Sequence, residues 1–169
     1  NALRPNLPCQ LEAFSSYADL ETQLRRVLGE HHFDWVIHAA AVSDFSVDHI
    51  EQDGKTGTST GKLSSSGKLS LHLKPNAKLL PRLRDWSANA AVRVIGFKLT
   101  AAADHATRLK AVSKLFENAG VDAVVHNDLN EMRDLSEIQP GRHRYTLHTS
   151  RAVARECADS TELNSAIEQ

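Results

Sequence analysis

The sequence predicts an α/β fold in which a mainly parallel sheet is covered by helices on both faces. Apolar runs of strand length alternate along the chain with amphipathic patterns of roughly 10 to 15 residues, which is typical of this fold class. The chain has 169 residues, of which 41% are hydrophobic and 24% are charged. That length suits one hydrophobic core and is short for two, so we expect a single domain over residues 1–169.

The first half of the chain is predicted to form two strands, one helix and a long loop. The helix has Ser15 or Ser16 as its N-cap and Gly29 near its C-terminal end. The strand after it is an apolar run interrupted only by His38, which is typical of a strand buried on both faces. The expected elements are a strand at 10–14, the helix at 15–29, the buried strand at 35–40 and a polar loop at 46–68.

The second half continues the alternation. Leu69, Leu71 and Leu73 alternate with polar residues at the period of a half-exposed strand. Pro81 either lies in the first turn of the next helix or breaks it. Gly120 is a natural stop for a longer helix. The expected elements are a strand over 69–73, a short helix within 76–86, a strand at 92–96, a helix at 103–118, a strand at 121–128, a more exposed strand at 142–150 and a closing helix at 151–168.

The ends of three predicted strands carry small, polar and charged side chains. Ligands of parallel α/β sheets bind beyond the carboxyl ends of the strands, so these ends predict the place of a site. The polar loop brings lysines to the same neighbourhood, and small residues, an acid and cations together suggest a nucleotide. The residues concerned are Ala39, Ala40, Ala41 and Asp44 after the first strand, Phe97 and Lys98 after the second, and Asn127 and Asp128 at the third.

Charge and composition exclude several classes of partner. Lys and Arg total 20 against 21 Asp and Glu, so no overall field would attract nucleic acid or an anionic membrane. No apolar run approaches the roughly 20 residues that span a bilayer. Cys9 and Cys157 lie far apart, which favours reduced thiols over a disulfide framework. We therefore expect a cytoplasmic protein without nucleic-acid or membrane partners.

Motifs for other ligands are incomplete. The nine histidines are scattered, and no His, Cys or carboxylate cluster has the short spacing of a zinc site, so no metal ligands are predicted. His38 and His126 are interpreted as satisfied core or rim histidines. The segment from Gly57 to Lys62 has one residue too few for a phosphate-binding loop, and Leu63 stands where that loop needs a hydroxyl.

A short-chain dehydrogenase is the rival enzyme interpretation, because DWVIHAA also fits a strand of those NAD-binding folds. Such enzymes need a Tyr and a Lys four residues apart. Neither Tyr17, followed by Glu21, nor Tyr145, followed by Thr149, provides that pair. The G-x-G-x-x-G turn is also missing from these 169 residues, although a preceding segment could hold it. This alternative stays open as the weaker one.

Five short motifs occur in an order that resembles phosphopantothenoylcysteine synthetase of coenzyme A biosynthesis. No single motif is specific, but five in the same order and spacing are hard to obtain by chance. The resemblance implies a Rossmann-like three-layer fold and covers most of residues 34–128. The motifs are AAAVSDF at 39–45, K-x-S-S at 62–65, L-x-L-K-P at 71–75, I-G-F at 95–97 and VDAVVHND at 121–128.

The resemblance implies an acid to amino acid ligase. Members of the family activate the carboxylate of 4'-phosphopantothenate with CTP, release pyrophosphate and let cysteine displace CMP from the acyl cytidylate. A carboxylate is a poor electrophile until it becomes a phosphate ester, and cations must hold the phosphates while charge shifts. Mg²⁺ accompanies the nucleotide, and the enzymes are homodimers that in many bacteria are fused behind a flavin-dependent decarboxylase.

The resemblance also implies a set of site residues. Lys62 is the catalytic candidate and would lie on the triphosphate. Asp44 would accept hydrogen bonds from the base and ribose, Phe97 would pack against the nucleotide, Lys114 would be a second phosphate cation and Asn127 would close the pocket floor. The implied nucleotide-binding residues are Ala40, Ala41, Asp44, Lys62, Ala77, Lys78, Leu79, Leu80, Phe97, Lys114, Asn118 and Asn127.

The chain departs from the family pattern in three places. The family's glycine-rich turn and an assisting asparagine precede the point where this sequence begins, so we expect a fragment whose first strands and helices are missing. Asn118 stands where the family often has a second lysine, and the loop from Asp48 to Gly61 is longer than usual. A degenerate synthetase-like module that binds or dimerises without turnover is therefore the alternative to an active ligase.

Overall fold

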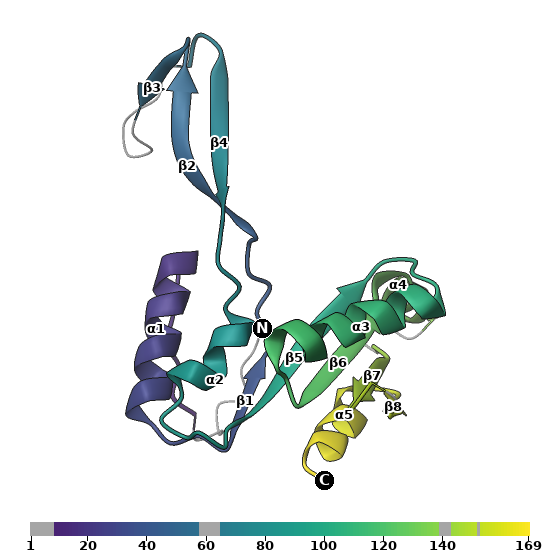
Figure 1. The fold of residues 1–169 in the computed structure, drawn as a ribbon. Helices are drawn as coiled ribbons and strands as arrows, with labels where there is room; N and C mark the ends of the chain where they lie inside the picture. Colours follow the sequence, from purple (N-terminus) through teal and green to yellow (C-terminus); the bar gives the residue numbers. More distant parts are fainter. Residues whose placement is uncertain (1–8, 58–64, 139–142, 152) are drawn as a thin grey trace.

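The computed structural model describes residues 9–57, 65–138, 143–151 and 153–169 of the chain (Figure 1). Helices and strands alternate through most of this length. In order, the elements are α1 (Tyr17–Glu30), β1 (Trp35–His38), β2 (Phe45–Gln52), β3 (Lys55–Gly57), β4 (Leu69–Pro75), the 3₁₀ turn η1 (Leu80–Arg82), α2 (Leu83–Trp86), β5 (Arg93–Thr100), α3 (His105–Ala119), β6 (Ala123–Asp128), α4 (Leu129–Ile138), β7 (Tyr145–His148), β8 (Ala154–Cys157) and α5 (Ser160–Ile167).

Five strands form the central sheet in the order β1-β5-β6-β7-β8. β1, β5 and β6 run parallel, and β7 and β8 extend the sheet antiparallel. Strands buried on both faces read as continuous apolar runs, which is how β5 and β6 could be recognised in the sequence. The prediction that the strand at 35–40 is buried on both faces is wrong, because β1 lies at the end of the strand order in the described sheet and its Ile37 is 52% exposed. The predicted α/β fold with a mainly parallel, Rossmann-like sheet is confirmed, and the antiparallel edge is an addition to it.

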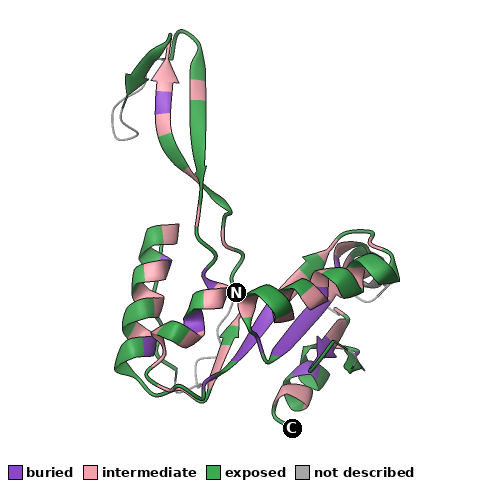
Figure 2. Cartoon of the chain, in the orientation of Figure 1, coloured by how far each residue is buried: buried purple, intermediate pink, exposed green. Residues whose placement is uncertain are grey.

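Two apolar clusters hold the sheet between layers of helices. Figure 2 shows the buried residues concentrated along β5 and β6 in the middle of the molecule. On one face α1, α2 and α3 contribute to a cluster of Leu28, Leu83, Val92, Val94, Val112, Val121 and Val124. On the other face α5 contributes to a cluster of Ile95, Ala123, Val125, Leu147, Cys157 and Leu163. The result is the expected three-layer arrangement.

A second sheet of three antiparallel strands, β3-β2-β4, projects from the central sheet as an arm (Figure 1). The prediction of a polar loop over 46–68 is therefore wrong at β2 (Phe45–Gln52) and β3 (Lys55–Gly57). The pairing of β2 with β4 shifts register between Val47 and His49, so Asp48 is an extra residue in the manner of a β-bulge. The bulge breaks the period-2 alternation of apolar and polar residues, which hid the strand from the sequence pattern.

Two terminal elements also differ from prediction. Residues 10–14 form no strand, because their partners are side chains of α1: Gln23 Nε2 donates to the Ala13 carbonyl at 2.6 Å, and Arg26 pairs with Glu12. The closing helix predicted at 151–168 is wrong over its first part. β8 occupies Ala154–Cys157, and α5 begins only after Asp159, whose carboxylate accepts from two amides of its first turn.

The end of the chain also buries more than the sequence suggested. β7 was expected to be more exposed, yet Leu147 and His148 are buried. Leu147 packs in the cluster that includes Cys157 of β8 and Leu163 of α5. α4, which directly follows β6, was not predicted. Its apolar pattern is short, and a strand that passes straight into a helix leaves no turn residue to mark the boundary.

The remaining helix signals are confirmed. Ser16 caps α1 in a capping box with Asp19, Pro81 lies in the first turn of η1, and α3 ends at Gly120 in the left-handed region with φ of 59°. β5 runs four residues beyond the predicted end at Gly96, to Thr100. In the described ranges no helix combines the length and the apolar character that crossing a bilayer requires.

Candidate functional site

A cavity of about 310 Å³ lies at the carboxyl ends of β1 and β5, where the topology predicts a ligand site. Its volume is at the small end of the range of roughly 300 to 1,000 Å³ for ligand pockets. It gathers residues from the end of β1, the turn before η1 and the middle of β5. The lining residues are His38, Ala40, Val42, Ser43, Asp44, Ala77, Lys78, Leu79, Leu80, Phe97 and Lys98.

Asn76 fixes the rim of this cavity by joining the two chain segments that enter the arm. Its amide Nδ2 donates to the Ser43 carbonyl at 3.0 Å, and its backbone N–H donates to the Asp44 carbonyl at 2.8 Å. Its Oδ1 accepts from the Ser46 hydroxyl at 2.7 Å. The Tyr17 hydroxyl on α1 donates to the Ala77 carbonyl at 2.9 Å. These bonds hold the two sides of the rim together without using the side chains that face the cavity.

Asp44 and Lys78 form an ion pair across the cavity mouth. Both side chains are well exposed, at 63% and 67% of their surface. An exposed pair of this kind contributes only about 0 to 1 kcal/mol to stability, so a ligand can separate its partners at little cost. The carboxylate can then accept hydrogen bonds from hydroxyl groups, and the ammonium can bind a phosphate.

The wall of the cavity depends on a close approach between η1 and β5. A Cβ on Gly96 would lie 3.0 Å from Leu80 Cδ2 and 3.3 Å from Leu115 Cδ2, so only glycine lets these side chains pack so closely on β5. Leu79 is buried, so it offers a ligand little more than its backbone. Phe97, one residue after Gly96, presents a half-buried ring to the cavity.

The cavity also contains polar residues that the family resemblance did not imply: His38, Ser43 and Lys98, of which only Lys98 was expected from its place at a strand end. His38 pairs with Gly96 in the sheet, and burial holds the pKa of its imidazole below the ordinary value, so the ring is neutral at pH 7. Lys98 adds a second cation to the lining. His38 could have been suspected in the same way, from its position near a strand end. Such a position indicates that a residue reaches the carboxyl edge of the sheet, but it does not indicate which way the side chain points.

The other predicted site residues lie elsewhere. Ala41 lines a smaller neighbouring cavity of about 170 Å³ near the start of α1. Lys114 and Asn118 are exposed on α3, and the Asn127 amide donates to Met132 Sδ at 2.9 Å. None of these four is among the residues that line the strand-end cavity. Lys62 lies outside the described residues.

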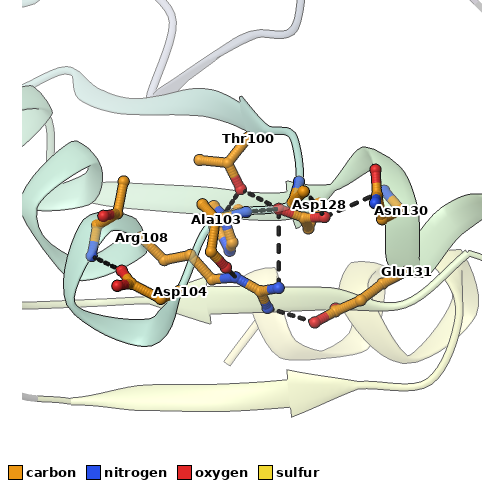
Figure 3. A network of polar contacts seen from close by, with 10 residues as sticks. Thr100, Ala103, Asp104, Arg108, Asp128, Asn130 and Glu131 are labelled. Carbon is orange, nitrogen blue, oxygen red and sulfur yellow. Dashed lines mark hydrogen bonds and ion pairs between the residues drawn. The ribbon is translucent and has the colours of Figure 1, made fainter.

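Asp128, at the end of β6, is the centre of a buried network (Figure 3). Its carboxylate accepts from the Thr100 hydroxyl at 2.6 Å and from the backbone N–H groups of Ala102, Ala103 and Asn130 at 3.2, 3.3 and 3.0 Å. The Thr100 hydrogen bond, above all, lowers the pKa of Asp128 to about 2, and Arg108 adds its charge at 3.7 Å. The strand-end acid that sequence placed near the site is therefore an anchor between β5, α3 and α4.

A larger hollow of about 670 Å³ lies between residues 10–14 and α1. It shares no lining residue with the strand-end cavity and contains none of the predicted site residues. Its outer wall is a segment without regular structure, held to α1 by the Gln23 and Arg26 contacts described above. We therefore take the strand-end cavity as the candidate site, since chemistry-bearing groups from separate elements converge there.

Known proteins share both the sequence pattern and the fold of this chain. A curated relative, the coenzyme A biosynthesis bifunctional protein CoaBC of Methanocaldococcus jannaschii, is 32% identical over 99 residues, which are 59% of this chain and 22% of that protein. The chain thus spans about a fifth of the relative's length.

Two solved structures are similar in fold. The DNA/pantothenate metabolism flavoprotein from Streptococcus pneumoniae matches with a TM-score of 0.73 and 18% identity, over 92% of this chain and 69% of that one. The C-terminal domain of the coenzyme A biosynthesis bifunctional protein CoaBC matches with a TM-score of 0.62 and 17% identity, over 99% of this chain and 65% of that one. The profile of one protein family matches residues 5–165, nearly the whole chain. The chain therefore belongs to the DNA/pantothenate metabolism flavoprotein C-terminal domain family.

Proposed function

We propose that this chain is the nucleotide-binding part of a phosphopantothenate-cysteine ligase of coenzyme A biosynthesis. The observation that carries the proposal is the strand-end cavity: seven of the twelve residues implied by the family resemblance line it, although they come from three separate segments of the chain. The kinship with a coenzyme A biosynthesis protein supports the same pathway. The reaction would join 4'-phosphopantothenate to cysteine at the expense of CTP.

The cavity suggests how the nucleotide would be held. The small side chain of Ala40 leaves room for a planar base, and Phe97 offers a ring for it to pack on. Asp44 would exchange Lys78 for ribose hydroxyls, and Lys78 and Lys98 would then face phosphate oxygens. Lys62 is proposed to bind the triphosphate and to stabilise the negative charge that develops as pyrophosphate leaves.

The chemistry follows from that placement. The carboxylate of 4'-phosphopantothenate attacks the α-phosphorus of CTP, pyrophosphate leaves and an acyl cytidylate forms. The amine of cysteine then displaces CMP and forms the amide. Mg²⁺ would accompany the triphosphate, bound through its phosphate oxygens, and would neutralise part of the phosphate charge. Lysines that face the phosphates keep the departing pyrophosphate in place while charge shifts.

A homodimer is part of the proposal, and the arm offers the surface for it. One face of the arm carries Phe45, Val47, Leu69, Leu71 and Leu73, each at least 42% exposed. A two-fold axis places the same patch of each copy against the other, so an apolar face is complementary to its own copy. We further propose a cytoplasmic location, which the two free cysteines suit, and an association with a flavin-dependent decarboxylase.

Calorimetric titration of the chain with CTP tests the nucleotide site. Ala40→Leu should fill the cavity and lower CTP affinity at least about tenfold, whereas Ala90→Leu, at an exposed turn away from the cavity, should leave it unchanged. Equal affinity of both variants would place the nucleotide elsewhere. An absence of binding to the unsubstituted chain would favour the degenerate module.

Turnover needs a separate test. The protein that carries this chain should release pyrophosphate from CTP only when 4'-phosphopantothenate is present, and Lys62→Gln should abolish that release. Release that is unchanged in Lys62→Gln would remove Lys62 from the chemistry. Release with ATP at the same rate as with CTP would contradict the choice of nucleotide.

A further inference from the structure

The polar face of the arm brings two histidines and a glutamate together. His49 on β2 is the direct partner of His72 on β4, and Glu51 lies two residues beyond His49 on the same strand. Direct cross-strand partners and residues two apart share one face of a sheet, so all three side chains project from the same side. The side chains are only 34%, 35% and 45% exposed for His49, Glu51 and His72. Sequence spacing could not show this cluster, because His72 lies 21 residues after Glu51 and 23 after His49.

The ligand atoms of this cluster are close to one another. The imidazole rings of His49 and His72 stack with centroids 4.2 Å apart and planes 8° apart. Both rings turn Nε2 to the same carboxylate: His49 Nε2 lies 3.8 Å from Glu51 Oε1, and His72 Nε2 lies 3.4 Å from Glu51 Oε2. One ligand atom from each residue can be chosen so that all lie within 4.8 Å of one another.

Asp48 completes the arrangement from behind. Its carboxylate lies 3.0 Å from His49 Nδ1, and it also pairs with Lys74 at 3.4 Å. Because Nδ1 of His49 faces Asp48, Nε2 is the nitrogen that faces Glu51. A carboxylate behind a ligating histidine is the usual second partner of a metal-bound imidazole.

We propose that His49, Glu51 and His72 form a binding site for a divalent transition metal ion, with Zn²⁺ as the preferred ion. Two imidazoles and one carboxylate are a common three-residue Zn²⁺ set, which leaves a fourth position for water or another ligand. Mg²⁺ prefers oxygen ligands and keeps several of its waters, so it does not suit a site with two nitrogens. The site is separate from the nucleotide cavity and does not depend on the proposed ligase activity.

Only a small adjustment is needed for the three groups to converge. The lone pairs of two stacked rings run almost parallel, so the rings must rotate about their Cβ–Cγ bonds until both face one point. Torsions of this sp³–sp² type have broad energy wells, and partial exposure leaves the rings room to turn. The bound ion would link β2 to β4 within the arm, four residues after β2 begins at Phe45 and three residues before β4 ends at Pro75.

Calorimetric titration of the metal-free chain with ZnCl₂ tests the site, with Cys9→Ser as the background because that thiol is exposed. We expect one Zn²⁺ per chain, unaffected by millimolar MgCl₂. Asp48→Asn should weaken binding about 10- to 100-fold. His72→Gln and Glu51→Gln should weaken it by at least that factor. His105→Gln, at an exposed position on α3, should bind like the background chain.

Two results would overturn the proposal. One is the absence of saturable Zn²⁺ binding by the background chain. The other is equal loss of affinity in His105→Gln and His72→Gln, which would mean that scattered surface histidines account for the heat. Co²⁺ provides a second readout, because a four-coordinate Co²⁺ ion absorbs visible light. This absorption should disappear in His72→Gln and remain in His105→Gln. Far-ultraviolet circular dichroism of each variant confirms that the fold is kept.

Discussion

Replacing Asp128 by asparagine should destabilise the protein and remove a defined part of its sensitivity to acid. The side chain of Asp128 has no exposed surface, and its carboxylate accepts hydrogen bonds from Thr100 and three backbone N–H groups. Asparagine has the same shape but carries no charge, and one of its two terminal atoms is a donor that would face these donors. Leaving a buried donor without a partner costs about 1 to 3 kcal/mol.

The charge contributes a second, pH-dependent part. The pKa of Asp128 is about 2 in the folded protein against an ordinary value of 3.8, so the unfolded chain binds more protons between these values. The stabilisation is fully present above the unfolded pKa and is lost as the pH falls through the folded pKa. At about 1.4 kcal/mol for each pH unit, the difference amounts to roughly 2 kcal/mol at pH 7. Together with the misplaced donor, we expect the unfolding free energy to fall by roughly 3 to 5 kcal/mol at pH 7.

Urea unfolding followed by circular dichroism at pH 7 and at pH 2.5 measures both parts. The gap in unfolding free energy between the natural chain and Asp128→Asn should narrow by roughly 1.5 kcal/mol at the lower pH, because most of the linkage is then lost. Asp34→Asn, at an exposed position, is the matched control and should change stability by less than about 0.5 kcal/mol. A gap of the same size at both pH values would refute the assignment of a low pKa to Asp128.

Three further predictions concern the site and its supports. Gly96→Ala should lower the unfolding free energy by about 1 to 3 kcal/mol and weaken CTP binding, because the new methyl group meets Leu80 and Leu115. Gly57→Ala is the neutral control, because among the described residues the Ile50 carbonyl at 3.8 Å is the one atom near the added methyl group. Lys98→Gln should weaken CTP binding more than Lys114→Gln in calorimetry, since only Lys98 lines the cavity; the reverse order would support the prediction from family resemblance. Ser16→Ala should cost about 1 kcal/mol in thermal unfolding through loss of the α1 cap, while unaltered stability would mean that the cap is dispensable.

The sequence predicted the parts of the fold whose signals are local. Continuous apolar runs marked β1, β5 and β6, and cap residues marked the start of α1 and the end of α3. Prediction was wrong where pairing between distant segments decides the structure. β2 contains a bulge that interrupts its alternation, and residues 10–14 have strand-like composition but no neighbouring strand with which to pair. β8 forms because β7 offers it an edge, which no local pattern of residues 151–158 reveals.

The candidate site divides in the same way. The rule that ligands bind at the carboxyl ends of parallel strands predicted Asp44 and Phe97 for one site, and the family resemblance added Ala77 and Lys78. All four residues line the same cavity. Neither the rule nor the resemblance showed that Asp128 turns inward to its own network, or that His38 reaches the cavity. Side-chain direction at a strand end depends on the exact register and on which backbone N–H groups need an acceptor.

By itself, the sequence determined the class of fold, the positions of the apolar strands along the chain and the family. Apolar patterns and short motifs are properties of consecutive residues. The tertiary structure alone decided which side chains meet. Sheet pairing placed His49 opposite His72 across the arm, and the approach of η1 to Gly96 shaped the cavity wall. Such contacts join residues far apart in the chain, and their energies depend on distances of a few ångströms that only the folded chain fixes.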